Sequence, residues 1–81
     1  MTLKARFKEW FASLFYLREG YDVPIYSEGK VWPMGYYFES RREAIDFARN
    51  DIRLMPGEYV TVEAVFSGHP PITIYDSRRD V

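Results

Sequence analysis

Cysteine is absent from this chain of 81 residues, and histidine occurs only once. The lack of cysteine excludes a disulfide framework and a cysteine zinc site, and it fits a reducing compartment such as the cytoplasm. Cysteine and histidine are also the usual nucleophiles, proton shuttles and transition-metal ligands of proteins. Their scarcity predicts a chain that binds a partner and is not an enzyme, with neither a metal nor a cofactor.

Long apolar runs and catalytic constellations are missing as well. No stretch approaches the roughly 18 apolar residues that a membrane-spanning helix needs, so we expect no membrane span. Lys4, Arg6, Lys8 and Glu9 interrupt the apolar start of the chain, which predicts that no secretory signal is present. The five glycines are isolated turn formers, and His69 has no neighbouring acid–base partner.

Aromatic residues, in contrast, make up 19% of the chain. Such side chains supply core and contact area at a low entropy cost, which suits packing and partner binding. The net charge is −1, which argues against a strong electrostatic partner of either sign. Residues 1–18 hold four basic side chains and one acidic side chain, which gives this segment a net charge of +3. The remainder of the chain holds seven basic and eleven acidic side chains, which gives it a net charge of −4.

Periodicity divides the chain into two helices and two hairpins, followed by a short polar tail. Apolar residues at helical spacing predict a helix over 2–18, which Gly20 ends. A hairpin over 21–38 turns at 27–30, and the pattern of Ser40 and Glu43 is that of a capping box that begins a helix over 41–54. The remaining elements are a hairpin over 58–75 and the tail, 76–81.

This order, α-β-β-α-β-β, predicts a single α+β domain over 1–81 with a four-stranded antiparallel sheet and two helices packed on it. Our preferred arrangement places both helices on one face of the sheet, although the pattern leaves open which face the first helix covers. The covered face would carry Tyr21, Val23, Ile25, Trp32, Met34, Tyr36, Phe38, Val60, Val62, Ala64, Phe66, Ile72 and Ile74. The opposite face would carry Tyr26, Tyr37, Tyr59, Thr61, Thr73 and Tyr75.

Four tyrosines on an uncovered sheet face predict a partner-binding surface of Tyr26, Tyr37, Tyr59 and Tyr75. Two other interpretations stay open: ordinary cross-strand pairing, and burial of these rings beneath the first helix. Arg42 and Arg49 would orient the partner at the rim of this surface. A solvated helix face explains the same arginines without a partner, since Asp46 lies between them.

Three functions are compatible with these features. The first is a small protein-binding module, an inhibitor or adaptor of the kind carried by phages or mobile elements, that acts by occupying a partner's surface. The second is a nucleic-acid-binding domain that uses the aromatic strand from Trp32 to Phe38 and the basic helix face, although an acidic chain lacks the electrostatic term that drives such binding. The third is a self-assembling subunit, for instance a homodimer. For the aromatic residues of the first helix we expect core packing, and not contact with a membrane surface.

Overall fold

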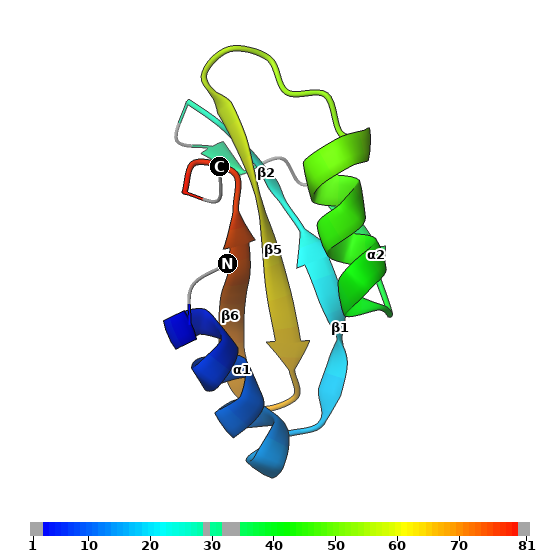
Figure 1. Ribbon diagram of the computed structural model, residues 1–81, viewed down its shortest axis with the longest axis vertical. Helices are drawn as coiled ribbons and strands as arrows, with labels where there is room; N and C mark the ends of the chain where they lie inside the picture. Colours follow the sequence, from blue (N-terminus) through cyan, green and yellow to red (C-terminus); the bar gives the residue numbers. More distant parts are fainter. Residues whose placement is uncertain (1–2, 29, 32–34, 80–81) are drawn as a thin grey trace.

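The computed structural model describes residues 3–28, 30–31 and 35–79 of the chain. It is an α+β fold with an antiparallel sheet and two helices, as the sequence predicts (Figure 1). The elements are α1 (Leu3–Phe15), β1 (Arg18–Val23), β2 (Ile25–Ser27), β3 (Lys30–Val31), β4 (Tyr36–Phe38), α2 (Arg41–Asp46), the π-helical turn η1 (Phe47–Asp51), β5 (Glu58–Phe66) and β6 (His69–Asp76).

The long strand β5 organises the sheet. On one side it pairs with β6, and on the other side it pairs with β2 and then β1 along its length. The outer partners are β4, which pairs with β1, and β3, which pairs with β2. Every one of these pairs is antiparallel.

The prediction of four strands in the order α-β-β-α-β-β is wrong, because the sheet has six strands. The first predicted strand is divided at Pro24, which has no N–H to donate to a ladder. Its carbonyl still accepts from the N–H of Thr61 at 3.3 Å, so β1 and β2 follow one continuous course along β5. The second predicted strand is divided into β3 and β4, and the residues 32–34 between them lie outside the described residues.

The first helix is shorter than the range 2–18 predicts, and Gly20 does not end it. The chain enters β1 at Arg18, which pairs with Phe66, while the N–H of Ser67 donates to the carbonyl of Leu17 at 2.8 Å. Sheet pairing therefore takes the residues that the apolar pattern assigned to the last helical turn. The apolar pattern of residues 2–18 gives no information about pairing with a strand that lies far away in the sequence, so it could not predict this competition.

The second helix begins as its capping residues predict and ends earlier than expected. The hydroxyl of Ser40 accepts from the N–H of Glu43 at 3.3 Å, which satisfies one donor of the first turn. From Phe47 the helix continues as the π-helical turn η1, which ends at Asp51 instead of residue 54. Gly57, with φ +87°, then turns the chain into β5.

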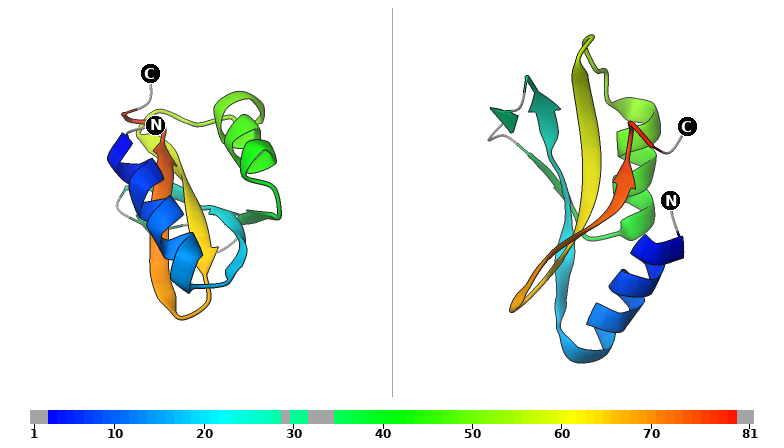
Figure 2. Two further views of the ribbon diagram at one scale, coloured as in Figure 1. Left: turned by 60° about the horizontal axis from the view of Figure 1, so that its bottom comes forward. Right: turned by 90° about the vertical axis from the view of Figure 1, so that its left-hand side faces the viewer.

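Both helices lie against the same face of the sheet, which we call the helix face: α1 packs over β6 and α2 over β1 and β4 (Figures 1 and 2). Ala44 of α2 and Ala48 of η1 are buried there, and their small side chains let the helical segment approach the sheet closely. The described sheet residues assigned to this face supply most of the core: Tyr21, Val23, Val60, Val62, Ala64, Phe66, Ile72 and Ile74.

A bulge in β6 changes the face on which Tyr75 lies. Val62 pairs with Tyr75 and Glu63 pairs with Thr73, so Ile74 is an extra residue in β6. Ile74 and Tyr75 consequently both point to the helix face, and Tyr75 is buried. The expectation that Tyr75 belongs to the opposite face is therefore wrong.

Candidate functional site

The face of the sheet opposite the helices carries the first candidate surface, which we call the tyrosine face (Tyr26, Tyr37 and Tyr59). Tyr26 in β2 and Tyr59 in β5 are cross-strand partners. Their rings stack with centroids 4.7 Å apart and an interplanar angle of 8°. The guanidinium of Arg78 covers Tyr59 at 3.7 Å from the ring centroid, which is the geometry of a cation–π contact.

Polar contacts fix this stack in place. Asp76 accepts from Arg78 at 2.8 Å and 3.1 Å, and these hydrogen bonds hold the pKa of the Asp76 carboxyl below its usual value. The hydroxyl of Tyr26 donates to Glu63 at 3.1 Å, while burial raises the pKa of Tyr26. Tyr26 and Tyr59 are thus half-buried side chains whose rings are already engaged within the molecule.

Tyr37 is the most exposed member of the tyrosine face, with 54% of its surface accessible. It pairs with Asp22, which in turn pairs with Glu63, so two carboxylates separate it from the Tyr26–Tyr59 stack. Its ring lies over Gly20, and its hydroxyl donates to the carbonyl of Glu19.

The predicted partner-binding residues do not form one surface. Arg42 and Arg49 lie in α2 and η1, which pack on the helix face, away from the three tyrosines. The Arg42 guanidinium lies 3.9 Å from the carboxylate of Asp46, in an exposed pair that contributes little. Of these residues, Tyr26 and Tyr59 stack on each other, whereas Tyr75 lies in the core.

The second candidate surface arises because α1 turns the side that carries Glu9 and Ala12 toward the sheet. Glu9, on that side, is only 6% exposed. Its carboxylate accepts from the hydroxyl of Tyr21 at 3.2 Å and from Nε of Arg41 at 3.0 Å. Ala12, one turn further along the helix, is 1% exposed and lets α1 lie close to the sheet.

The apolar side of α1 consequently faces outward. We call this surface the α1 aromatic face; it consists of residues at positions i, i+3, i+4, i+7 and i+8, of which Trp10 is 58% and Phe15 68% exposed. Adjacent rings contact one another along it, with centroids 6.1 Å apart for Phe7 and Trp10 and 5.2 Å for Phe11 and Phe15. Its members are Phe7, Trp10, Phe11, Leu14 and Phe15.

The expectation that these side chains pack in the core is wrong. An amphipathic pattern gives the direction of the apolar side relative to the helix axis, but it does not say whether that side faces the sheet or the solvent. The signal that sequence reasoning missed is Ala12, a small apolar residue on the same side of the helix as Glu9. Because alanine is small, it permits the helix to pack closely against the sheet on that side.

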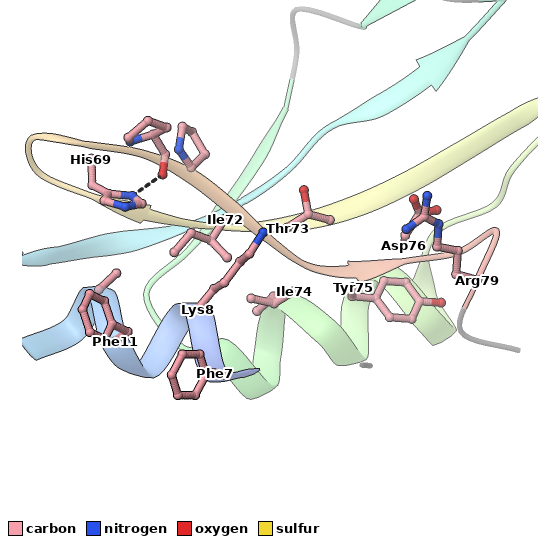
Figure 3. Close-up of a pocket in the computed structure, with 13 residues that line it drawn as sticks. Phe7, Lys8, Phe11, His69, Ile72, Thr73, Ile74, Tyr75, Asp76 and Arg79 are labelled. Atoms are coloured by element: carbon pink, nitrogen blue, oxygen red, sulfur yellow. Dashed lines mark hydrogen bonds between the residues drawn. The ribbon is translucent and has the colours of Figure 1, made fainter. Parts of the chain in front are cut away.

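A groove of about 690 Å³ adjoins the α1 aromatic face, between α1 and β6 (Figure 3). Phe7 and Phe11 lie on its helix side, Ile72 and Ile74 lie on its strand side, and the side chain of Lys8 extends between them. The groove therefore continues the exposed apolar surface into a concave region.

Comparison of the chain with models of known protein families, with curated protein sequences and with solved structures finds no match. Within the described ranges, neither helix combines the length and the apolar character needed to cross a bilayer. The described residues also contain no group of three or more His, Cys, Asp or Glu side chains arranged to hold a metal ion.

Proposed function

We propose that this chain is a small, non-catalytic protein-binding module that docks on a partner through the α1 aromatic face. The observation that carries the proposal is the orientation of α1, whose Glu9 is bound to Tyr21 of the sheet and to Arg41 of α2 and whose ring-bearing side is exposed. An inhibitor or an adaptor works in this way, by occupying a surface of another polypeptide.

The spacing of the exposed residues matches a known mode of peptide recognition. Helices that lie in an apolar groove of a partner use anchors at i, i+3, i+4 and i+7, as Phe7, Trp10, Phe11 and Leu14 do here. Tryptophan at the centre of such a surface is the side chain most often found to dominate binding energy. Arg6 and Lys8 are exposed beside the face and favour a partner with an acidic rim.

The tyrosine face is a second contact surface in this proposal. Tyr37 and Val31 are both more than half exposed there, whereas Tyr26 and Tyr59 are half-buried. The acidic residues Asp22 and Glu63 lie on the same face and would repel phosphates. This charge pattern supports a protein partner over a nucleic acid.

Capture experiments with matched variants test the proposal. The immobilised chain should retain specific polypeptides from a lysate of the native host, and the variant Trp10→Glu/Leu14→Glu should lose them. Met55→Glu is the matched control, because Met55 is also an exposed apolar residue, at 69%, and lies outside α1. Equal retention by all three proteins would contradict the proposal.

A further inference from the structure

We infer that the α1 aromatic face binds a second copy of the same chain, with the two α1 helices antiparallel. This inference rests on the proposed function, because it names a partner for the surface proposed there. Three observations carry it: the area of the face, the groove beside the face, and the distribution of charge along α1.

The area of the face matches the requirement of a small dimer interface. Its five members are between 51% and 68% exposed. With roughly 200 Å² for each large side chain, they present on the order of 600 Å². The largest apolar patch on a typical soluble monomer is about 300–600 Å², so the α1 aromatic face lies at the upper end of this range. Two copies would together bury about 1,200 Å², the lower end of the range for specific stable interfaces.

The surface is also complementary to itself, which a twofold interface requires, since both copies contribute the same patch. The rings of α1 project outward, and the groove beside them has an apolar part at Phe7, Phe11 and Ile72 and a polar part at Lys8 and Asp76 (Figure 3). Rings that project from one copy therefore have a concave, partly apolar site to enter on the other copy. A flat bilayer surface would leave this groove unfilled.

The charges near α1 favour the antiparallel arrangement. Arg6 and Lys8 are exposed near the start of the helix, whereas the exposed residues just beyond its end, Arg18 and Glu19, carry opposite charges. Two parallel helices would bring the basic starts of both copies together. Two antiparallel helices keep these starts apart and place Arg6 and Lys8 of one copy near Glu19 of the other, which is favourable.

Sedimentation equilibrium of the full chain tests the inference. The wild-type protein should be a dimer with a dissociation constant in the micromolar range, as expected for an interface near the lower size limit. Trp10→Glu/Leu14→Glu should weaken association at least about 100-fold, since it buries four carboxylates in the interface. Met55→Glu should dimerise like the wild type, and circular dichroism should show that all three proteins are folded.

A charge-reversal cycle tests the orientation of the helices. Lys8→Glu and Glu19→Lys should each weaken the dimer about two- to tenfold, the size expected for exposed ion pairs, and the double variant should recover most of the loss. A stronger dimer for Lys8→Glu alone would indicate parallel helices and overturn the antiparallel arrangement.

A monomer mass for the wild type at millimolar concentration would overturn the inference. The same monomer, if it co-sediments with vesicles of phosphatidylglycerol and phosphatidylcholine and loses this binding in Trp10→Glu/Leu14→Glu, would assign the face to an anionic lipid surface instead. If the wild type is a monomer but still captures a host protein through the same two residues, the inference fails while the proposed function holds.

Discussion

Glu9 in α1 and Arg41 in α2 form an ion pair, with 3.0 Å between the carboxylate oxygen and Nε. Because Tyr21 of β1 donates to the other carboxylate oxygen, one acidic side chain connects both helices to the sheet. This contact fixes the side of α1 that carries Glu9 against the fold. The exposure of the rings on the other side of the helix is therefore a consequence of how α1 is attached.

The first prediction concerns this attachment. Glu9→Ala should lower the free energy of unfolding by about 2 kcal/mol, because it removes hydrogen bonds that involve a charged group in a buried position. Asp46→Ala removes the exposed partner of Arg42 and is the control, for which we expect a loss below about 0.5 kcal/mol. Urea denaturation of the two variants measures the difference, and equal losses would show that the Glu9 contact is no stronger than a surface pair.

The antiparallel α+β character, the strand β5 and the cap of the second helix could be predicted from the sequence because they depend on local signals. Alternation over β5 selects the residues that face the core, and Ser40 caps α2 as its spacing with Glu43 indicates. The division of the first predicted strand could be predicted only in part. Pro24 favours an edge position, but whether it interrupts the strand depends on how the neighbouring strand pairs with it.

The candidate site could not be predicted in the same way, since it depends on which side of α1 meets the sheet. The attachment joins Glu9 to Tyr21 and Arg41, which are 12 and 32 residues away along the chain. The bulge that turns Tyr75 inward is likewise a property of the pairing between two strands. Neither relationship has a local pattern, so the sequence alone placed the rings of α1 inside and Tyr75 outside.

The second prediction concerns Gly20, which lies directly beneath the ring of Tyr37. A methyl group at this position would overlap the phenol, but Tyr37 is 54% exposed and its ring can turn aside, so Gly20→Ala should destabilise the fold by only about 1 kcal/mol. In a Tyr37→Ala background the same substitution should be neutral or stabilising, because the overlapping ring is gone and alanine is favoured over glycine within a strand. Denaturation of the four proteins forms a double-mutant cycle, and additive losses would show that the ring does not lie over the glycine.

The third prediction tests the bulge in β6. Tyr75→Ala should lower the free energy of unfolding by about 3 kcal/mol, since it removes a large buried side chain from the core. Thr73→Ala is the matched control in the same strand: Thr73 is exposed, and we expect a change below about 0.5 kcal/mol. The midpoints of thermal unfolding compare the two variants, and similar midpoints would indicate a regular β6 with Tyr75 on the tyrosine face.

The fourth prediction concerns pH. Burial, and next the negative charge of Glu9, raise the pKa of Tyr21 above its usual value of 10.0. The folded state therefore holds the phenol proton more tightly than the unfolded state does, so this contribution to stability is complete below pH 10 and is lost as the pH rises through the raised pKa. Tyr21→Phe has no such proton to lose, and its stability should fall less steeply above pH 10 than that of the wild type. Urea denaturation at several alkaline pH values measures the two slopes. Parallel slopes would show that the Tyr21 phenol ionises as readily in the fold as in the unfolded chain. This outcome would contradict the raised pKa that its burial beside Glu9 predicts.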